Sequence, residues 1–397
     1  MGTGSRGWSV IALFTTVLVV WAALCNAADL RVPDDYRTIE EAVRAARSGD
    51  TIIVEDRSLR DSITIRNARR ITITNDSHRD VVLRGRRDTE PVIELINCSD
   101  ITIIGFTIQS GSMGIYAERC RDITLEECTV KWNAGPGLYV DEYTAQTTTK
   151  IFILEDTTIM ENATWGIEVI GDPESLAKAQ IEMIDSEITG NRSGGLMIRD
   201  ARATIESTDF TANRGYGIVV DGSTEVEFVD SGSPTVISDN HSGGVLVRDA
   251  TFTLQGTTRI ENNIGVGIEA ERANLAVIGA TITGHGTAAI IYRESQGSVS
   301  HSTISDNPGL GIVIEQGSDV NISSTDVARQ GGDGIRVLSS ATVTISNGSS
   351  LRSNGGVGLL ADATTVTMTG SSATDNNGAG VRLINAVSYT HLTLPTN

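Results

Sequence analysis

"NRSGGLMI" at residues 191–198 returns as "NRGYGIVV" at 213–220 and as "NHSGGVLV" at 240–247. All three stretches follow one pattern, Asn-x-x-x-Gly-apolar-x-apolar, which recurs from residue 110 almost to the end of the chain. Glycine fills eleven of the twelve central positions and Ala289 fills the other; they are residues 114, 137, 166, 195, 217, 244, 267, 289, 311, 334, 358 and 380. Self-similarity at a nearly fixed period is typical of solenoids, so we expect stacked coils.

The length of the repeat narrows the architecture. Successive central positions are 22 to 24 residues apart, apart from three longer steps of 29, 29 and 27. The longer steps indicate insertions around residues 141–150, 171–180 and 222–234. A second alternating apolar stretch precedes each asparagine, as in "ITLEECTV" at 123–130, so each coil should hold two or three short strands.

Two solenoid types have a period near 22 residues. A leucine-rich repeat is disfavoured, because "LEECTVKWN" at 125–133 has Cys and Thr where that motif needs leucine. Residues branched at the β-carbon also occupy the part of the repeat that would be helical. The sequence therefore predicts an all-β fold, a right-handed single-stranded parallel β-helix with rungs about 4.8 Å apart.

The asparagine position has a structural interpretation. Nine of its twelve occupants are Asn, and the others are Ser110, His285 and Gln330. Stacked asparagines can hydrogen-bond to one another, and asparagine tolerates the left-handed backbone of a tight turn. We therefore expect an asparagine ladder along one corner of the solenoid.

The N-terminal end predicts a cap. Thr38 is suited to be the helix N-cap, Glu41 completes a capping box, and Gly49 follows the helix end. A helix over 38–48 would present an apolar stripe of Ile39, Ala42, Val43 and Ala46 to the first rung.

The stretch "VPDDYRTIEEAVRAARSGDTIIVEDRSLRDSITI" at 32–65 resembles the opening of secreted pectin-lyase-like β-helix proteins. These include proteins with carbohydrate-binding and sugar-hydrolase (CASH) repeats and NosD-like periplasmic proteins, and the resemblance covers about residues 30–385. It implies a secreted protein that binds or acts on a polysaccharide or cell-surface glycan, as a lyase or a hydrolase if it is an enzyme. One scaffold serves many activities, so a non-catalytic surface or envelope module stands beside this reading. A NosD-like accessory role in metal-cluster assembly is a minor third reading, because the chain has no cluster of Cys, His and Met.

The two ends of the chain carry their own predictions. Residues 1–27 have a basic start at Arg6, an apolar run and small residues before the expected cleavage site, which indicates a signal peptide and a secreted or periplasmic protein. No later segment is long and apolar enough to cross a membrane. The last residues, "VSYTHLTLPTN" at 387–397, break the repeat and back-translate to a sequencing adapter. We therefore expect a β-helix over 28–386 that is truncated at its C-terminal end.

Charge constrains the partners. The net charge of −19 disfavours nucleic acid and anionic membranes, and it makes an acidic polymer an awkward ligand without a bridging cation. Acidic residues recur four positions after the central glycine, and others recur five positions after it. The first set is Glu118, Asp141, Asp221, Glu271, Glu315 and Asp362; the second is Asp200, Asp249 and Glu294. Stacked carboxylates could recruit Ca²⁺, with Asp200, Asp221 and Asp249 as candidate ligands, or they could pair with the interleaved arginines on a solvated turn.

Catalytic candidates come from "TITGHGTAAIIYRE" at 281–294, whose Gly-His-Gly resembles a polygalacturonase signature. The aspartates that accompany this signature are absent. The nearest carboxylates are Glu261 and Asp306, two rungs apart and so about 9.6 Å between α-carbons, which suits an inverting pair of carboxyl groups. Glu261, His285 and Asp306 are thus candidate catalytic residues. The alternative is that His285 only fills the ladder.

Two further sets complete the candidates. Trp132, Tyr139, Tyr143 and Trp165 lie on the early long coils, where they could stack on sugar rings or serve in packing. Cys98 and Cys120 are 22 residues apart in matching contexts, so they should stack on neighbouring rungs. They could form a disulfide or stay as a pair of buried thiols.

Overall fold

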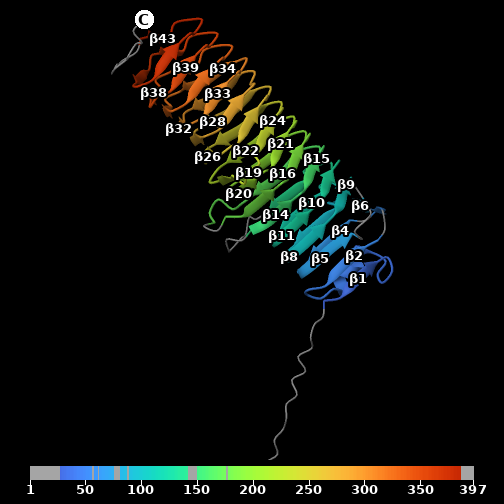
Figure 1. Ribbon diagram of the computed structural model, residues 1–397. Coiled ribbons are helices and arrows are strands. Elements are labelled where there is room, and N and C mark those ends of the chain that lie inside the picture. The colour runs from blue at the N-terminus through green and yellow to red at the C-terminus, as the bar shows by residue number, and fades with distance from the viewer. Residues whose placement is uncertain are drawn as a thin grey trace, which may run out of the picture.

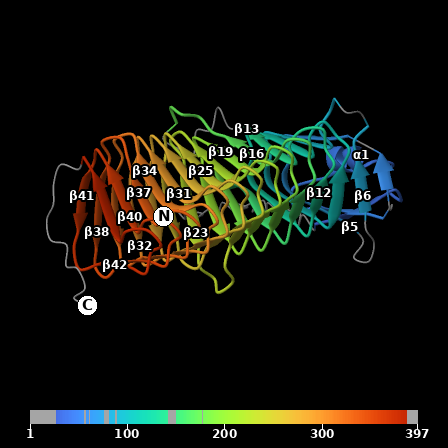
Figure 2. The same ribbon diagram turned by 90° about the horizontal axis from the view of Figure 1, so that it is seen from above.

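The chain forms one long parallel β-solenoid (Figures 1 and 2). The computed structural model describes residues 27–55, 58–60, 62–75, 81–86, 89–141, 150–175 and 178–385. Most of the predicted signal peptide, Tyr143 and residues 387–397 lie outside these ranges. No helix among the described residues is long and apolar enough to cross a membrane.

Three strands from each coil join sheets that run along the rod. Among the described residues, sheet A has nine strands: β1 (Asp29–Val32), β2 (Thr51–Val54), β5 (Arg69–Asn75), β8 (Ser99–Ile104), β11 (Arg121–Glu126), β14 (Lys150–Glu155), β17 (Gln180–Ile184), β20 (Arg202–Glu206) and β23 (Glu225–Val229). Sheet D continues on the same side with six: β26 (Thr251–Gln255), β29 (Asn274–Ile278), β32 (Gln296–Ser300), β35 (Asp319–Ser323), β38 (Thr342–Ser346) and β41 (Thr365–Met368).

In the part of the chain that the structure describes, the other two sheets each hold fourteen strands. Sheet B contains β3 (Ser58–Arg60), β6 (Val81–Arg84), β9 (Phe106–Gln109), β12 (Thr129–Lys131), β15 (Thr158–Met160), β18 (Glu187–Thr189), β21 (Asp209–Thr211), β24 (Val236–Ser238), β27 (Arg259–Glu261), β30 (Thr281–Thr283), β33 (Thr303–Ser305), β36 (Asp326–Ala328), β39 (Ser350–Arg352) and β42 (Ser372–Thr374). Sheet C contains β4 (Ile63–Arg66), β7 (Ile93–Ile96), β10 (Ile115–Glu118), β13 (Leu138–Asp141), β16 (Trp165–Ile170), β19 (Gly194–Arg199), β22 (Tyr216–Asp221), β25 (Gly243–Arg248), β28 (Val266–Glu271), β31 (Ala288–Arg293), β34 (Leu310–Glu315), β37 (Ile335–Val337), β40 (Leu359–Asp362) and β43 (Val381–Ile384).

Parallel stacking places equivalent residues of successive coils on top of one another. In sheet C, Ile167 pairs with Leu196, and Leu196 pairs with Ile218. All three side chains are fully buried. Because side chains alternate along a strand, the neighbouring column points outward. The predicted parallel β-helix is confirmed, with a continuous aliphatic core inside the coils.

The asparagine ladder forms at the corner between sheets B and C. Asn162 donates from Nδ2 to Oδ1 of Asn191 at 3.0 Å, and Asn191 donates likewise to Asn213 at 3.1 Å. Ten of the twelve ladder positions are buried, and the two end positions, Ser110 and Asn376, are partly buried. One detail differs from the expectation: the left-handed residue is the one before the asparagine, such as Ala212 with φ 52°, because the turn bends there and then directs the amide inward.

The N-terminal helix α1 covers Ile39–Ala45 and is therefore shorter than the predicted 38–48. Thr38 Oγ1 accepts from the backbone N–H of Glu41 at 3.1 Å, as the capping box requires. The helix ends early because Ala46 takes an extended backbone, with φ −62° and ψ 143°. Ile39 and Ala42 are fully buried, and α1 contacts β1, β2 and β4 at the blue end of the rod in Figure 2.

Candidate functional site

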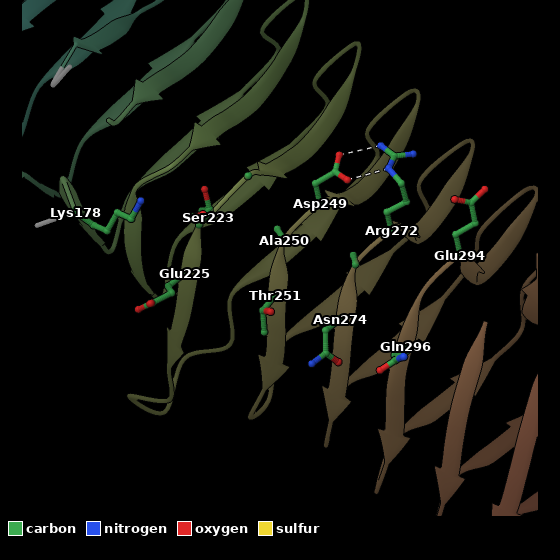
Figure 3. A pocket seen from close by; sticks show the side chains of 13 residues that line it. Lys178, Ser223, Glu225, Asp249, Ala250, Thr251, Arg272, Asn274, Glu294 and Gln296 are labelled. Atoms are coloured by element: carbon green, nitrogen blue, oxygen red, sulfur yellow. Dashed lines mark hydrogen bonds and ion pairs between the residues drawn. The ribbon is translucent and has the colours of Figure 1, made fainter. Parts of the chain in front are cut away.

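A groove of about 610 Å³ follows the corner where sheet C turns into sheets A and D (Figure 3). One wall consists of turn residues Asp249, Arg272 and Glu294, and the opposite wall consists of the first residues of three strands, Thr251, Asn274 and Gln296. Each wall gains one residue per coil. The groove therefore extends along the solenoid axis.

The shape of the groove follows from the local backbone. Asp249, Arg272 and Glu294 have φ of 50°, 50° and 48°, a left-handed conformation that turns these side chains away from the core. The next residue in the first two of these coils is Ala250 or Ala273, which lie between the walls. Both alanines are buried, and their side chains are only methyl groups, so the surface between the two walls is recessed.

Two of the predicted insertions form the N-terminal end of the groove. Lys178 comes from the 171–180 insertion, and Gly222, Ser223 and Thr224 come from the 222–234 insertion. Gly222 has a φ of 64°, and an added Cβ would lie 2.6 Å from Oδ1 of Asp200. At this same place β23 ends sheet A and β26 begins sheet D, so the groove crosses the boundary between two sheets.

The groove is polar and mixed in charge. Asp249 accepts two hydrogen bonds from Arg272, from Nε and Nη2, each at 2.8 Å (Figure 3). The Arg272 guanidinium lowers the pKa of the Asp249 carboxyl, so Asp249 is an ionised acceptor at neutral pH. Lys178 and Arg272 face three acidic residues, of which Glu225 pairs with Arg202 at 2.9 Å.

Sequence comparison identifies the family. The family described as "Right handed beta helix region" matches residues 49–175, 91–232, 165–282 and 233–362, which together span most of the chain. The chain belongs to the right-handed β-helix family. No curated protein sequence matches it.

Solved β-helix structures resemble it at low identity. The A-module of the Azotobacter vinelandii mannuronan C-5 epimerase AlgE4 is 12% identical over 90% of this chain and 94% of its own, with a TM-score of 0.49. The pectate lyase Pel9A is 11% identical over 72% of each chain, with a TM-score of 0.44. The periplasmic alginate epimerase AlgG is 11% identical over 76% of this chain and 83% of its own, with a TM-score of 0.42.

The three candidate Ca²⁺ ligands, Asp200, Asp221 and Asp249, do not come together in one cluster. The Asp200 carboxylate accepts a hydrogen bond from the backbone N–H of Ser223, which lies on the next coil, at 2.9 Å. Asp221 pairs with Arg199 at 2.8 Å, while Asp249 pairs with Arg272. Within the described ranges no three His, Cys, Asp or Glu side chains are grouped closely enough to hold a metal ion.

The carboxylates do not stack on one another because acidic residues alternate with arginines along the column. Positions four residues after the central glycine stack in sheet C in the order Arg199, Asp221, Arg248, Glu271, Arg293 and Glu315. Each carboxylate in this column therefore has an arginine on a neighbouring rung. The second interpretation of the acidic stripe, a solvated turn with interleaved ion pairs, describes these rungs.

The three catalytic candidates do not form a shared surface site. His285 is fully buried in the ladder, where Nδ1 accepts from the backbone N–H of Asn263 at 3.2 Å and Nε2 lies 3.1 Å from the carbonyl oxygen of Ile260. Burial lowers the pKa of His285 to about 4, so the ring is neutral at neutral pH. The ladder interpretation of His285 therefore matches its position.

The two carboxylates of that set lie on the surface at the ends of sheet B strands two rungs apart, as the spacing predicts. Glu261 is held by Arg259 at 2.6 Å, and Asp306 receives two hydrogen bonds from Arg329, each at 2.7 Å. The Arg329 guanidinium lowers the pKa of the Asp306 carboxyl. Neither residue lines the groove.

Of the described aromatic candidates, Tyr139 and Trp165 lie on sheet C and Trp132 follows β12 of sheet B; none of them lines the groove. Tyr139 stacks on Tyr116 with ring centroids 5.8 Å apart, and Trp165 begins β16. Trp132 is 54% exposed, donates from Nε1 to Glu161 and lies under the Nζ of Lys131 at 4.4 Å. Tyr143 lies outside the described residues.

Cys98 and Cys120 are buried and are not joined by a disulfide in this structure. The backbone N–H of Arg121 donates to the carbonyl oxygen of Cys98, which places Cys120 directly one rung beyond Cys98. Both side chains are buried, and the two thiols hydrogen-bond to each other. The two cysteines therefore lie on neighbouring rungs, as their spacing predicts, and correspond to the pair of buried thiols.

The polar wall of the groove was not among the residues singled out from the sequence. Thr251, Asn274 and Gln296 each follow two residues after a left-handed turn residue, and ladders pair Thr251 with Asn274 and Asn274 with Gln296. Aligning the coils at the turn, rather than at the central glycine alone, would have placed these residues in one column.

Proposed function

We propose that this protein binds an uncharged polysaccharide along the groove between Asp249, Arg272 and Glu294 on one side and Thr251, Asn274 and Gln296 on the other. The observation that carries the proposal is the column of hydroxyl and amide side chains that repeats once per coil. Hydroxyl and amide groups both donate and accept hydrogen bonds, as sugar hydroxyls do. A polymer lying along the axis would meet an equivalent side chain at every rung, about every 4.8 Å.

The charges of the groove favour a neutral ligand. Its two cationic side chains, Lys178 and Arg272, are outnumbered by Glu225, Asp249 and Glu294. The whole chain carries a net charge of −19, which opposes the approach of an acidic polymer. A neutral glycan avoids this repulsion and still accepts hydrogen bonds from Arg272 and Lys178.

The groove supports binding rather than cleavage. A general acid needs a carboxyl group that holds a proton near the working pH. Asp249 is instead kept ionised by Arg272. We propose a non-catalytic glycan-binding module that works outside the cytoplasm, as the leader predicted over residues 1–27 implies.

Isothermal titration with soluble polysaccharides tests this proposal. The panel contains neutral xyloglucan, galactomannan and mixed-linkage glucan, together with acidic polygalacturonate and alginate. We expect a neutral glycan to bind and Thr251→Ala, Asn274→Ala or Gln296→Ala to weaken it by about fivefold each, the effect of losing one hydrogen bond. Thr342→Ala is the matched control, because Thr342 lies in the same column two rungs beyond Gln296 and does not line the groove.

Three results would overturn the proposal. Preferential binding of the acidic polymers would contradict the charge argument. Equal affinity of the Thr251→Ala and Thr342→Ala proteins would move the site away from the groove. New reducing ends or products that absorb in the ultraviolet would show an enzyme in place of a binding module.

A further inference from the structure

Aromatic side chains concentrate on the outward side of sheet C. Residues 28–386 contain eight tyrosines and tryptophans, and four of them lie on strands β10 to β22. We call the surface that these four residues form the aromatic face: Tyr116, Tyr139, Trp165 and Tyr216. On β10 and β13 the flanking Ile115, Ala117, Leu138 and Val140 are buried in the core, so the tyrosines between them point outward and are only partly covered.

The rings of Trp165 and Tyr216 each lie over a glycine of the neighbouring strand. Trp165 pairs with Gly194 and Tyr216 pairs with Gly243 in the ladder of sheet C. A Cβ added to Gly194 would lie 2.1 Å from Cζ3 of Trp165, and one added to Gly243 would lie 2.6 Å from Cε1 of Tyr216. The glycines thus leave room for each ring to lie over the neighbouring strand.

Further contacts order the side chains of the three tyrosines. The rings of Tyr116 and Tyr139 are nearly parallel, at 9°, and Tyr116 Oη donates to Glu118 at 3.3 Å. Tyr216 Oη donates to Oε2 of Glu269 at 2.7 Å. Rings that are already ordered lose little side-chain entropy when a ligand binds.

Carboxylates border the aromatic face. Glu168 continues the column of Tyr116 and Tyr139, and Glu118 and Asp141 end the two strands that carry these tyrosines. Burial raises the pKa of Glu168 and raises the pKa of Tyr116 to about 12, so Tyr116 is a neutral phenol at neutral pH. Carboxylate oxygens accept hydrogen bonds from sugar hydroxyls, and they repel sugars that carry carboxylate or sulfate groups.

We propose that the aromatic face is a second glycan-binding surface, which takes uncharged sugars by stacking their apolar faces on Trp165, Tyr139 and Tyr216. A pyranose ring has an apolar face that can pack on a partly exposed aromatic ring. The aromatic face is separate from the groove, because the column of Arg199, Asp221 and Arg248 lies between the two. It stands on its own observations and does not depend on the proposed function of the groove.

Tryptophan fluorescence and isothermal titration with the full chain test the aromatic face. The probes are neutral hexasaccharides of glucose, xylose, mannose and N-acetylglucosamine, with hexagalacturonate as the acidic probe. We expect a neutral probe to bind, and Trp165→Ala and Tyr139→Ala each to raise its Kd by about tenfold, as for other aromatic anchors. Tyr139→Phe keeps the ring and should bind as the unmodified protein does.

Groove variants separate the two proposals. Asn274→Ala should leave hexasaccharide binding at the aromatic face unchanged. Trp165→Ala should leave the affinity of the groove for its polysaccharide unchanged. The inference is overturned if no neutral probe binds, if hexagalacturonate binds best, or if binding survives Trp165→Ala and Tyr139→Ala in proteins that melt like the unmodified chain. A proline-rich peptide that competes for Trp165 would replace the glycan with a protein partner.

Discussion

Asn191 is the place where a single substitution should test the ladder most directly. Its side chain is fully buried and makes four hydrogen bonds. Oδ1 accepts from the backbone N–H and from Nδ2 of Asn162, both at 3.0 Å. Nδ2 donates to the carbonyl oxygen of Ile159 and to Oδ1 of Asn213, both at 3.1 Å. Asn191→Ala removes all four and leaves buried partners without a bond.

The magnitude follows from these contacts. At about 1 kcal/mol net for each hydrogen bond, Asn191→Ala should lower the local stability by about 4 kcal/mol. Asn191→His should cost about half as much, because an imidazole can accept from Asn162 and donate to Ile159, as His285 does on its own rung. Asn377→Ala is the control, since its exposed amide makes one hydrogen bond, to Gly355 at 3.2 Å.

Hydrogen exchange is the appropriate assay. Each coil of a solenoid contacts only its neighbours, so a global melting curve can hide a local loss. The opening free energies of the amides of Asn162 and Asn213 should fall, while that of Ile322, several coils away, should not change. A fall of less than about 1 kcal/mol at Asn162, or an equal fall at Ile322, would refute the claim that the ladder stabilises each corner locally.

Two other predictions concern buried titratable groups. Because burial lowers the pKa of His285 to about 4, the neutral ring should stabilise the fold fully above its unfolded pKa of about 6.5, and this contribution should be lost as the pH falls from there to 4. Urea midpoints should show that loss in the native chain, and His285→Asn should abolish it; an unchanged slope would place the titration elsewhere. For the cysteine pair, burial should keep Cys98 and Cys120 from reacting with glutathione disulfide in the native chain, although the hydrogen bond from Cys120 lowers the pKa of Cys98 to about 7. Urea should expose both thiols to the reagent; a loss of two thiols from the native chain that Cys98→Ser prevents and Cys128→Ser does not would contradict this expectation.

The sequence predicts stacking well because a parallel solenoid converts a period into contacts. Once the repeat is aligned, the ladder from Asn162 to Asn213 needs no knowledge of the third dimension. The same logic placed Cys120 over Cys98. The period does not determine which way a side chain points at a corner, where the alternation of strands is interrupted. Asparagine tolerates a left-handed backbone, but the residue that adopts it here is the one before the asparagine.

Charge was harder to interpret for a related reason. Selecting acidic residues four positions after the glycine leaves out the coils that carry arginine there, so Asp221 looked like one of a stack of carboxylates. In the structure Arg199 and Arg248 occupy the rungs on either side of it. A charge pattern on a solenoid has to be evaluated for every coil in the column, because the electrostatic neighbour of a residue is the next coil and not the next acid.

The same rule explains how one rod can hold two different surfaces. Columns of a solenoid vary independently, since a change in one column alters only the residues stacked above and below it. The groove needs small corner residues such as Ala250 and Ala273 beside a polar column. The aromatic face needs glycines such as Gly194 under its rings. Asp221 forms ion pairs with Arg199 and Arg248 within its own column. This column lies between the two surfaces and separates them. A substitution that breaks this alternation, such as Arg248→Glu, places a third carboxylate between Asp221 and Glu271. It should lower the stability of these rungs, measured by hydrogen exchange, and leave glycan binding at both surfaces unchanged in isothermal titration.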